Sequence, residues 1–394
     1  MTGRILIAFF LLPLIPAMAA SYRFGAVWDG EKVQKDVCIN TREERIESIG
    51  PCGANAVDLS RYTAIPGLID VHTHMTFLLK NPVSAAGRGA AVVFLAQENA
   101  RKTLETGVTS VRDLNAGNYA DVAMRDLIAS GAMKGPRMFV SGGGLFRRPG
   151  DLAISVEELT KTVDERAKAG VDWIKMFGST GSGQDVTGEQ TFSFEQMKAA
   201  VDAAHRNGKR IAIHSYGPAG ARDAVRAGAD TLEHATDMDA ATIQEMVARK
   251  TFYVPTIDHN RFYAENFRVL NFAPESVKNL NGFIERNLAT ARIAFQAGVR
   301  FAMGSDAVRS MFGENTRELG WFVKAGMSPE QALRAATKNG AELLGQEGSL
   351  GALRAGYFAD IVAVEGDPLA DVQVVIDKVR WVMKGGDVVV DKTK

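Results

Sequence analysis

Two histidines separated by one residue are the first side chains in this sequence whose spacing suggests chemistry. His72 and His74 end the apolar stretch GLIDVHTHM. Alternate residues of a strand face the same way, so two imidazoles placed like this can bind one metal ion. The alternative is a pair of unrelated polar residues at a strand end. We favour the metal-binding pair because the buried stretch reaches the surface at this point.

Four more polar residues follow apolar stretches elsewhere in the chain. A lone histidine at a strand end is usually structural, and a lone lysine is usually solvated. Together, neutral imidazoles and a carboxylate form a ligand set that suits Zn²⁺ and similar ions. A second ion nearby would need a bridging anion, which a lysine provides only after reaction with CO₂ to form a carbamate. The residues are Lys175 in VDWIK, His214 in RIAIH, His234 in DTLEH and Asp306 in FAMGSD.

The elements that must position these residues alternate regularly along the middle of the chain. Between residues 63 and 345, eight short apolar stretches are separated by longer amphipathic ones, several of which end in glycine. Glycine is the usual residue just past a helix end. Eight such units predict an α/β fold, a (β/α)8 TIM barrel, whose active site lies at the carboxyl ends of its strands. An open doubly wound sheet is the alternative, but no glycine-rich phosphate turn follows the first stretch.

The two ends of the chain have a different sequence pattern from the middle. Residues 21–62 and 346–394 contain short valine-rich or alternating stretches joined by Asp-Gly, Gly-Gly and Gly-Asp turns. This pattern predicts strands rather than helices. Chain termini lie close together in many domains. We therefore expect one small β-sandwich domain formed by both ends of the mature chain.

Residues 1–20 have the pattern of a signal peptide. Arg4 precedes the apolar run ILIAFFLLPLI, and small residues follow, with a cleavage site near Ala19 or Ala20. The alternative is an uncleaved N-terminal anchor. The mature protein is therefore expected to be periplasmic or secreted. In such a compartment Cys38 and Cys52 could form a disulfide, but the sequence favours the alternative of two separate thiols, buried or half-exposed.

Composition narrows the classes of function. The 394 residues contain 46 Lys and Arg and 46 Asp and Glu, so the net charge is zero. No basic surface for nucleic acid is expected. Two cysteines are too few for a zinc site made of cysteine alone, and six histidines are available. The expected partner is a small molecule, with no membrane contact after signal cleavage, and the chain could form a homo-oligomer.

The motifs together resemble those of the metal-dependent amidohydrolase superfamily, in its imidazolonepropionase-like and Xaa-Pro dipeptidase-like branch. They include PGLIDVHTHM, GVTSVRDL, AGVDWIKMF, HSYG, AGADTLEHATDMD and GVRFAMGSDA, and the resemblance covers residues 22–394. It implies two divalent metal ions, with zinc the favoured ion. His72, His74 and Asp306 would bind one ion, His214 and His234 the other, and a carboxylated Lys175 would bridge them.

The resemblance also implies a mechanism. A hydroxide between the two ions attacks an amide carbonyl, and Asp306 passes its proton to the leaving nitrogen. Tyr216, two residues after His214, would donate to the oxyanion, unless it only packs at the rim. We expect His259 and Arg148 to contact the substrate. The alternative for both is an ordinary loop side chain.

The predicted function is therefore that of a binuclear amidohydrolase that cleaves an amide C–N bond, in a dipeptide or N-acyl amino acid. A cyclic-amide hydrolase, as in imidazolonepropionase, and a mononuclear deaminase are alternatives. Deaminase branches usually bind one metal and lack the bridging lysine, so Lys175 argues against the deaminase. A metal-free binding protein on the same fold is the alternative from another class.

Overall fold

The computed structural model describes residues 19–77, 88–148, 150–151 and 154–394. Most of the predicted signal peptide lies outside these ranges, and its last two residues, Ala19 and Ala20, begin the first strand. Within the described ranges, no helix combines the length and the apolar character needed to cross a membrane. The localisation stays a prediction.

Two parallel sheets form the centre of the molecule. Their strands coincide with the eight apolar stretches that the sequence singled out. Isolated parallel bridges, Leu145 to Met176 and Thr73 to Ala307, lie between the two sheets on both sides. This is an α/β fold of TIM-barrel type. One sheet has the order β5 (Leu68–Thr73), β6 (Val108–Asp113), β7 (Arg137–Val140), and the other β12 (Arg300–Phe301), β11 (Phe252–Val254), β10 (Thr231–Glu233), β9 (Arg210–His214), β8 (Trp173–Phe177).

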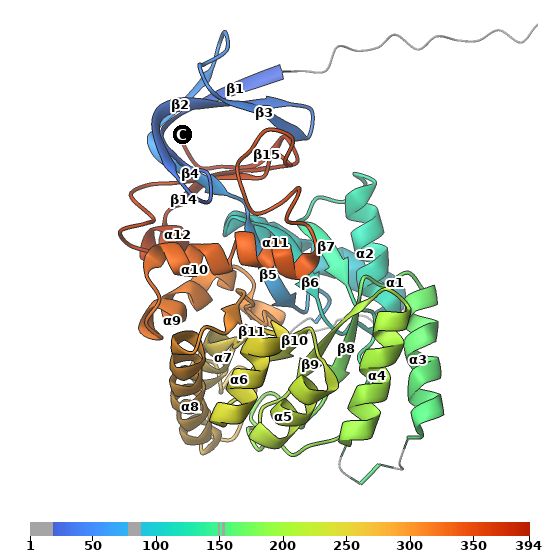
Figure 1. Cartoon of the computed structure of the whole chain (residues 1–394). Helices are drawn as coiled ribbons and strands as arrows, with labels where there is room; N and C mark the ends of the chain where they lie inside the picture. The colour runs from blue at the N-terminus through green and yellow to red at the C-terminus, as the bar shows by residue number, and fades with distance from the viewer. Residues whose placement is uncertain (1–18, 78–87, 149, 152–153) are drawn as a thin grey trace, which may run out of the picture.

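Helices follow the parallel strands and surround them (Figure 1). Those of the first half are α1 (Arg88–Glu105), α2 (Ala120–Ala129), α3 (Val156–Lys168), α4 (Phe194–Arg206), α5 (Pro218–Ala227) and α6 (Ala240–Arg249). Those of the second half are α7 (Ile257–Glu265), α8 (Ser276–Gln296), α9 (Glu318–Lys324), α10 (Pro329–Ala335) and α11 (Lys338–Leu344). The short α12 (Gln373–Asp377) comes later, between two strands near the C-terminus.

Local sequence explains where several of these helices begin and end. α3 and α4 begin with capping boxes, in which Ser155 pairs with Glu158 and Ser193 with Gln196. These pairs satisfy backbone donors that the first turn of a helix leaves open. α5 ends at Gly228, whose φ of 98° lies in the left-handed region that favours glycine. The chain then turns directly into β10.

Strands from both ends of the chain share one seven-stranded sheet, which lies at one end of the molecule (Figure 1). The N-terminal β4 pairs with β1 on one side and with the C-terminal β13 on the other. The predicted joining of the two chain ends is thus observed, whereas the second layer of a sandwich and the domain limits stay predictions. The order is β15 (Asp387–Asp391), β14 (Val379–Lys384), β13 (Ile361–Val364), β4 (Val57–Pro66), β1 (Ala19–Trp28), β2 (Val33–Arg42), β3 (Arg45–Gly50).

A separate apolar core holds this sheet together. Trp381 of β14 is buried, and its ring centroid lies 5.2 Å from that of Tyr22 and 6.2 Å from that of Phe24 in β1. Aromatic pairs at these separations add to the stabilisation that burial provides. The first and the last strands are therefore joined by side chains as well as by the backbone ladder.

Cys38 and Cys52 form a disulfide in the structure. Cys38 is buried in β2, and Cys52 lies two residues past the end of β3. Of the two alternatives that the sequence left open, the structure has the bridge. It closes a short loop across the β2–β3 hairpin.

Removal of this bridge should destabilise the protein. A crosslink that spans 14 positions restricts the unfolded chain, and its loss is expected to cost about 3 kcal/mol of unfolding free energy. The test is denaturant unfolding of the Cys38→Ser/Cys52→Ser protein and of the wild type. The bridge would be contradicted if the unreduced wild type had two titratable thiols and unfolded at the same denaturant concentration as the Cys38→Ser/Cys52→Ser protein.

Candidate functional site

A cavity of about 140 Å³ lies at the carboxyl ends of the parallel strands. All six predicted metal ligands line it, together with two of the three predicted substrate contacts, Tyr216 and His259. Arg148 is absent from the lining. The lining residues are His72, His74, Phe77, Asn115, Lys175, Phe177, Gly181, Ser182, His214, Tyr216, His234, His259, Tyr263, Asp306, Val308 and Arg309.

The two histidines of the first motif are fixed by a neighbouring strand. Asp113, at the end of β6, accepts hydrogen bonds from the Thr73 hydroxyl at 3.0 Å and from the Met75 backbone N–H at 2.5 Å. The residues on either side of His74 are therefore held to the second strand. As a result, His72 and His74 both reach the cavity although β5 ends between them.

Asp306 reaches the same cavity because its loop lies directly against β5. Its backbone N–H donates to the His72 carbonyl at 2.7 Å. At Gly304 a Cβ atom would lie 2.8 Å from the His72 Cβ atom and 2.5 Å from Val254, so only glycine fits there. Asp306 itself has a φ of 53°, and His234 has 71°. Such backbone strain in residues other than glycine is concentrated at functional sites.

The side chains of the cluster lie within contact of one another. The Asp306 carboxylate lies 2.9 Å from Nε2 of His74, 3.5 Å from Nε2 of His72 and 3.3 Å from Nε2 of His259. The rings of His72 and His234 have centroids 5.0 Å apart. One donor atom from each of His72, His234 and Asp306 falls within 4.8 Å of the other two, so these three residues alone could hold a metal ion.

A buried acidic residue orients His72. Nδ1 of His72 lies 2.7 Å from a carboxylate oxygen of Glu233, which leaves Nε2 facing the cavity. Arg112 donates to the other Glu233 oxygen at 3.0 Å, and all three side chains are nearly inaccessible to solvent. Burial raises the pKa of Glu233, but Arg112 and His72 outweigh this effect and lower it to about 2. Carboxylates often hold ligand histidines in this way.

Lys175 is the most unusual group in the cavity. Its side chain is 1% exposed, and its Nζ atom has no hydrogen-bond partner among the described residues. Burial lowers the pKa of Lys175 to about 8 despite the opposing effects of Glu233 and Asp306. A buried ammonium without a partner is costly. The neutral, nucleophilic form of this amine is therefore far more populated at physiological pH than that of an ordinary lysine.

Three of the histidines, His72, His214 and His234, are held in their neutral state. Burial, followed by the charge of Lys175, lowers the pKa of His72 to about 4 and that of His214 to about 3. Burial also holds the pKa of His234 well below its usual value. Nε2 of His72 and Nε2 of His214 have no hydrogen-bond partner within the described ranges, while Nδ1 of His234 bonds to Thr256 at 2.6 Å. Neutral imidazoles with free nitrogens are what a divalent metal requires.

Tyr216 lies inside the cluster rather than at the rim. It is 2% exposed, and its ring stacks on His214 on one side and on Phe283 on the other, with centroids 5.0 and 4.4 Å away. Burial raises the pKa of Tyr216 well above its ordinary value. Its hydroxyl therefore stays protonated at neutral pH and can donate a hydrogen bond.

The other two predicted substrate contacts have separate outcomes. His259, on α7, is buried beside Asp306 and packs edge-on against Tyr263, with ring centroids 4.2 Å apart. Arg148 is exposed, and its guanidinium carbon lies 5.8 Å from the ring of Phe146 on the surface. The role of each in substrate binding stays a prediction.

Comparisons with known proteins place this arrangement in a family. The model of the amidohydrolase family matches residues 63–389, which include every residue of the cluster. The chain belongs to the amidohydrolase family. It is therefore a hydrolase that acts on carbon–nitrogen bonds.

Relatives of known activity support this assignment. The amidohydrolase is 30% identical to ochratoxinase from Aspergillus niger over 373 residues, which cover 82% of this chain and 74% of the relative. A solved Xaa-Pro dipeptidase with bound methionine in its active site is 30% identical, with a TM-score of 0.84 over 94% of this chain and 99% of that one. A prolidase complexed with N-methylphosphonate-L-proline is 26% identical, with a TM-score of 0.84 over 95% and 100% of the two chains.

Sequence reasoning missed several residues of this amidohydrolase site. Glu233 and Arg112 were not singled out, although each is a charged residue inside an apolar strand, TLE or VTSVRD. Opposite charges in two buried strands are a signal that could have been used, because such charges must be paired. Tyr263 and Arg309 come from the segments after β11 and β12, where no pattern of spacing marks them.

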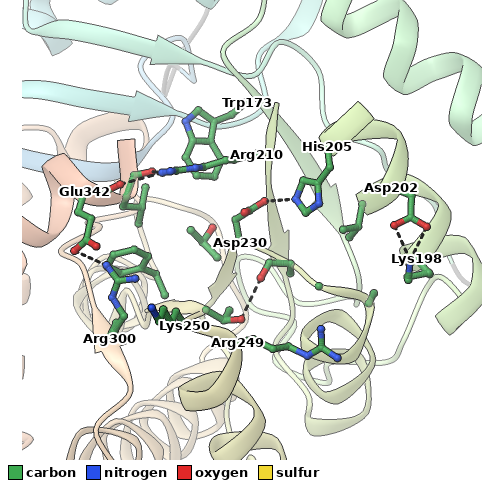
Figure 2. A pocket seen from close by; sticks show the side chains of 18 residues that line it. Trp173, Lys198, Asp202, His205, Arg210, Asp230, Arg249, Lys250, Arg300 and Glu342 are labelled. Carbon is green, nitrogen blue, oxygen red and sulfur yellow. Dashed lines mark hydrogen bonds and ion pairs between the residues drawn. The ribbon is translucent and has the colours of Figure 1, made fainter. Parts of the chain in front are cut away.

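A larger cavity, of about 600 Å³, lies at the opposite ends of the strands (Figure 2). The first residues of β8 to β12 line it, whereas the active sites of such folds lie at the carboxyl ends. Most of its charges are already paired, as Figure 2 shows for Lys198 with Asp202, His205 with Asp230 and Arg300 with Glu342. The smaller cavity is therefore the candidate active site.

Loss of Arg112 should destabilise the amidohydrolase strongly. Arg112→Met leaves the Glu233 carboxylate buried without its cation, which is expected to cost about 3–5 kcal/mol of unfolding free energy. The double variant Arg112→Met/Glu233→Gln removes both charges and should lose less unfolding free energy than Arg112→Met. Chemical denaturation measures both. Arg42→Met, which breaks an exposed ion pair with Glu47, is the control and should have only a small effect. Equal losses in the single and double variants would contradict the pairing.

Proposed function

We propose that this chain is a binuclear metal-dependent amidohydrolase that cleaves the amide bond of a dipeptide or an N-acyl amino acid. The observation that carries the proposal is Lys175, a buried amine without a partner in the described structure, in the same cavity as five histidines. The donor set fits two divalent cations, with zinc favoured by the imidazoles. His72, His74 and Asp306 would hold one cation, and His214 and His234 the other.

A carbamate on Lys175 would complete this site. The ammonium of Lys175 first loses one proton. The neutral amine then adds to the carbon of CO₂ through a new N–C bond, while one C–O π bond of CO₂ opens and a second proton leaves the nitrogen. Overall a cation becomes an anion with two oxygens, and two protons are released. That change removes the cost of a buried, unpaired ammonium and provides a bridge between the two positions. The lowered pKa of Lys175, about 8, makes the reactive amine available near neutral pH.

The relatives suggest the class of substrate. Ochratoxinase, the Xaa-Pro dipeptidase and the prolidase are similar to this chain over most of its length. A cavity of about 140 Å³ suits a small molecule. Phe77 and Phe177 give its lining apolar surface beside the polar cluster. A short N-acyl amino acid or dipeptide matches both the size and the mixed polarity.

The residues of this chain then have defined tasks. Divalent cations held by these residues would lower the pKa of a bound water and polarise the carbonyl. Burial raises the pKa of Asp306, but His259, His72 and His74 outweigh this effect and hold the pKa well below its usual range. The side chain is therefore an ionised carboxylate, which accepts the proton of the attacking water. It then gives this proton to the leaving nitrogen. Tyr216 donates to the developing oxyanion, and His259 lies where it can contact the substrate.

The remaining predictions on fold and location belong with this proposal. The parallel bridges Leu145–Met176 and Thr73–Ala307 support a closed (β/α)8 barrel. The mixed sheet of both chain ends supports the small accessory β-sandwich domain. The Cys38–Cys52 disulfide supports maturation in an oxidising compartment, in agreement with a periplasmic or secreted protein.

Elemental analysis of purified protein tests the function and the role of Lys175 together. We expect about two ions per wild-type chain and hydrolysis of N-acyl amino acids or dipeptides. Lys175→Ala should lose one or both ions and its turnover, and added short carboxylates should restore part of each. Lys198→Ala, at the opposite end of the barrel, is the matched control and should keep both ions. One ion in the wild type would favour a deaminase-like site, none a binding protein, and full occupancy in Lys175→Ala would refute the bridge.

Asp306→Asn tests the proton transfer. Removal of a general acid–base group typically costs 10²- to 10⁴-fold in rate, and we expect a loss of at least about 100-fold in kcat. Circular dichroism and the thermal midpoint show whether the fold is kept, and metal content is measured on the same sample. A folded, metal-loaded Asp306→Asn protein with wild-type kcat would remove Asp306 from the mechanism.

A further inference from the structure

A single arginine stands at the wall of the candidate active site. Arg309 follows β12 by a short loop and lies three residues after Asp306. Its backbone N–H donates to the Phe77 carbonyl at 2.8 Å, and its φ of 56° lies in the left-handed region. The loop is thus held in a strained conformation. Its side chain is half-buried and lines the cavity.

The guanidinium of Arg309 has no carboxylate partner. It makes no ion pair with any described residue, and the residues outside the described ranges include neither Asp nor Glu. The neighbouring arginines differ in this respect. Arg261 is paired with Asp258, Glu265 and Glu314, and Arg317 lies within 4 Å of Asp258 and Glu314. Arg309 is therefore a free cation that faces the cavity.

The charges of the cavity leave room for an anion beside Arg309. Asp306 is the only acidic residue in the described lining, and its two oxygens lie 2.9 Å from Nε2 of His74 and 3.3 Å from Nε2 of His259. Tyr263 lines the same wall. Burial raises the pKa of its phenol, and the nearby positive charge of Arg309 only partly offsets this rise, so the phenol stays protonated. A protonated phenol and a guanidinium together form donors for a carboxylate.

The position of Arg309 indicates which carboxylate. In a dipeptide or N-acyl amino acid, the carboxylate is separated from the leaving nitrogen by one carbon. Under the proposed function Asp306 protonates that nitrogen, so the carboxylate must lie close to Asp306. We propose that Arg309 binds the carboxylate of the leaving amino acid and makes the enzyme selective for amides of amino acids with a free carboxylate. This inference rests on the proposed function, and it assigns to Arg309 the role that the sequence suggested for Arg148.

The test compares an acid with its neutral analogue. The probes are N-acetylmethionine and N-acetylmethioninamide, and acetate release gives kcat and KM. The wild type should prefer the acid. Arg309→Met should raise KM for the acid by about 10- to 100-fold, the range expected for loss of a charged hydrogen bond, with little change in kcat or in the neutral probe. Arg309→Lys should be intermediate. Arg268→Met, which removes an exposed arginine outside the cavity, is the control.

The outcomes separate this inference from the proposed function. The inference is overturned if Arg309→Met keeps the wild-type preference for the acid. It is also overturned if KM for the acid rises in Arg148→Met and not in Arg309→Met. A wild type that hydrolyses neither probe counts against the proposed substrate. In that case calorimetric binding of N-acetylmethionine still decides the role of Arg309. A loss of affinity for N-acetylmethionine in Arg309→Met supports the proposed role of Arg309. Equal affinity in the wild type and the variant, or no binding to the wild type, overturns it.

Discussion

The buried pair of Arg112 and Glu233 is the interaction on which the site depends. Both side chains are fully excluded from solvent between the parallel strands, where neither charge is tolerated alone. Their contact neutralises both charges and leaves one carboxylate oxygen for Nδ1 of His72. Strands β6, β10 and β5, which are far apart in the sequence, are thereby fixed to one another below the cavity. The orientation of the first ligand follows from that contact.

Above this pair, the site combines groups that are individually unfavourable. The Lys175 amine is buried without a partner in the part of the chain that the structure describes, and Asp306 and His234 have left-handed backbones. Each feature costs free energy in the folded protein. They are maintained because close-packed segments, such as the contact of Gly304 with His72, leave the chain no alternative. Strain and unpaired donors at one point are typical of residues arranged for ligands rather than for stability.

Much of the scaffold was predictable, because it repeats a local pattern. Eight apolar stretches followed by amphipathic ones correspond to β5 to β12, and polar residues at their ends reach one cavity. That convergence follows from the common direction of parallel strands. The joining of both chain ends was predicted because each end has short expected strands separated by turns, and such strands need partners in a sheet.

What could not be predicted depends on contacts between distant segments. Nothing in the spacing marks Glu233 as the partner of His72, because a residue next to a ligand on a strand is expected to face elsewhere. Arg309 reaches the cavity through an irregular loop, while Arg148, equally suggestive in the sequence, lies on the surface. The Cys38–Cys52 pairing required the register of β2 and β3. Loop paths and strand registers are set by packing, which a single sequence does not display.

The pairing of β4 with β13 has a consequence for biogenesis. β4 is made early and β13 nearly 300 residues later, so a newly synthesised chain holds one long edge of β4 without its neighbour until synthesis is almost complete. An unpaired edge is a template for association with other chains. The order of synthesis therefore exposes this amidohydrolase to aggregation until its last strands emerge, and a chaperone that shields the early hairpins would act before β13 pairs with β4.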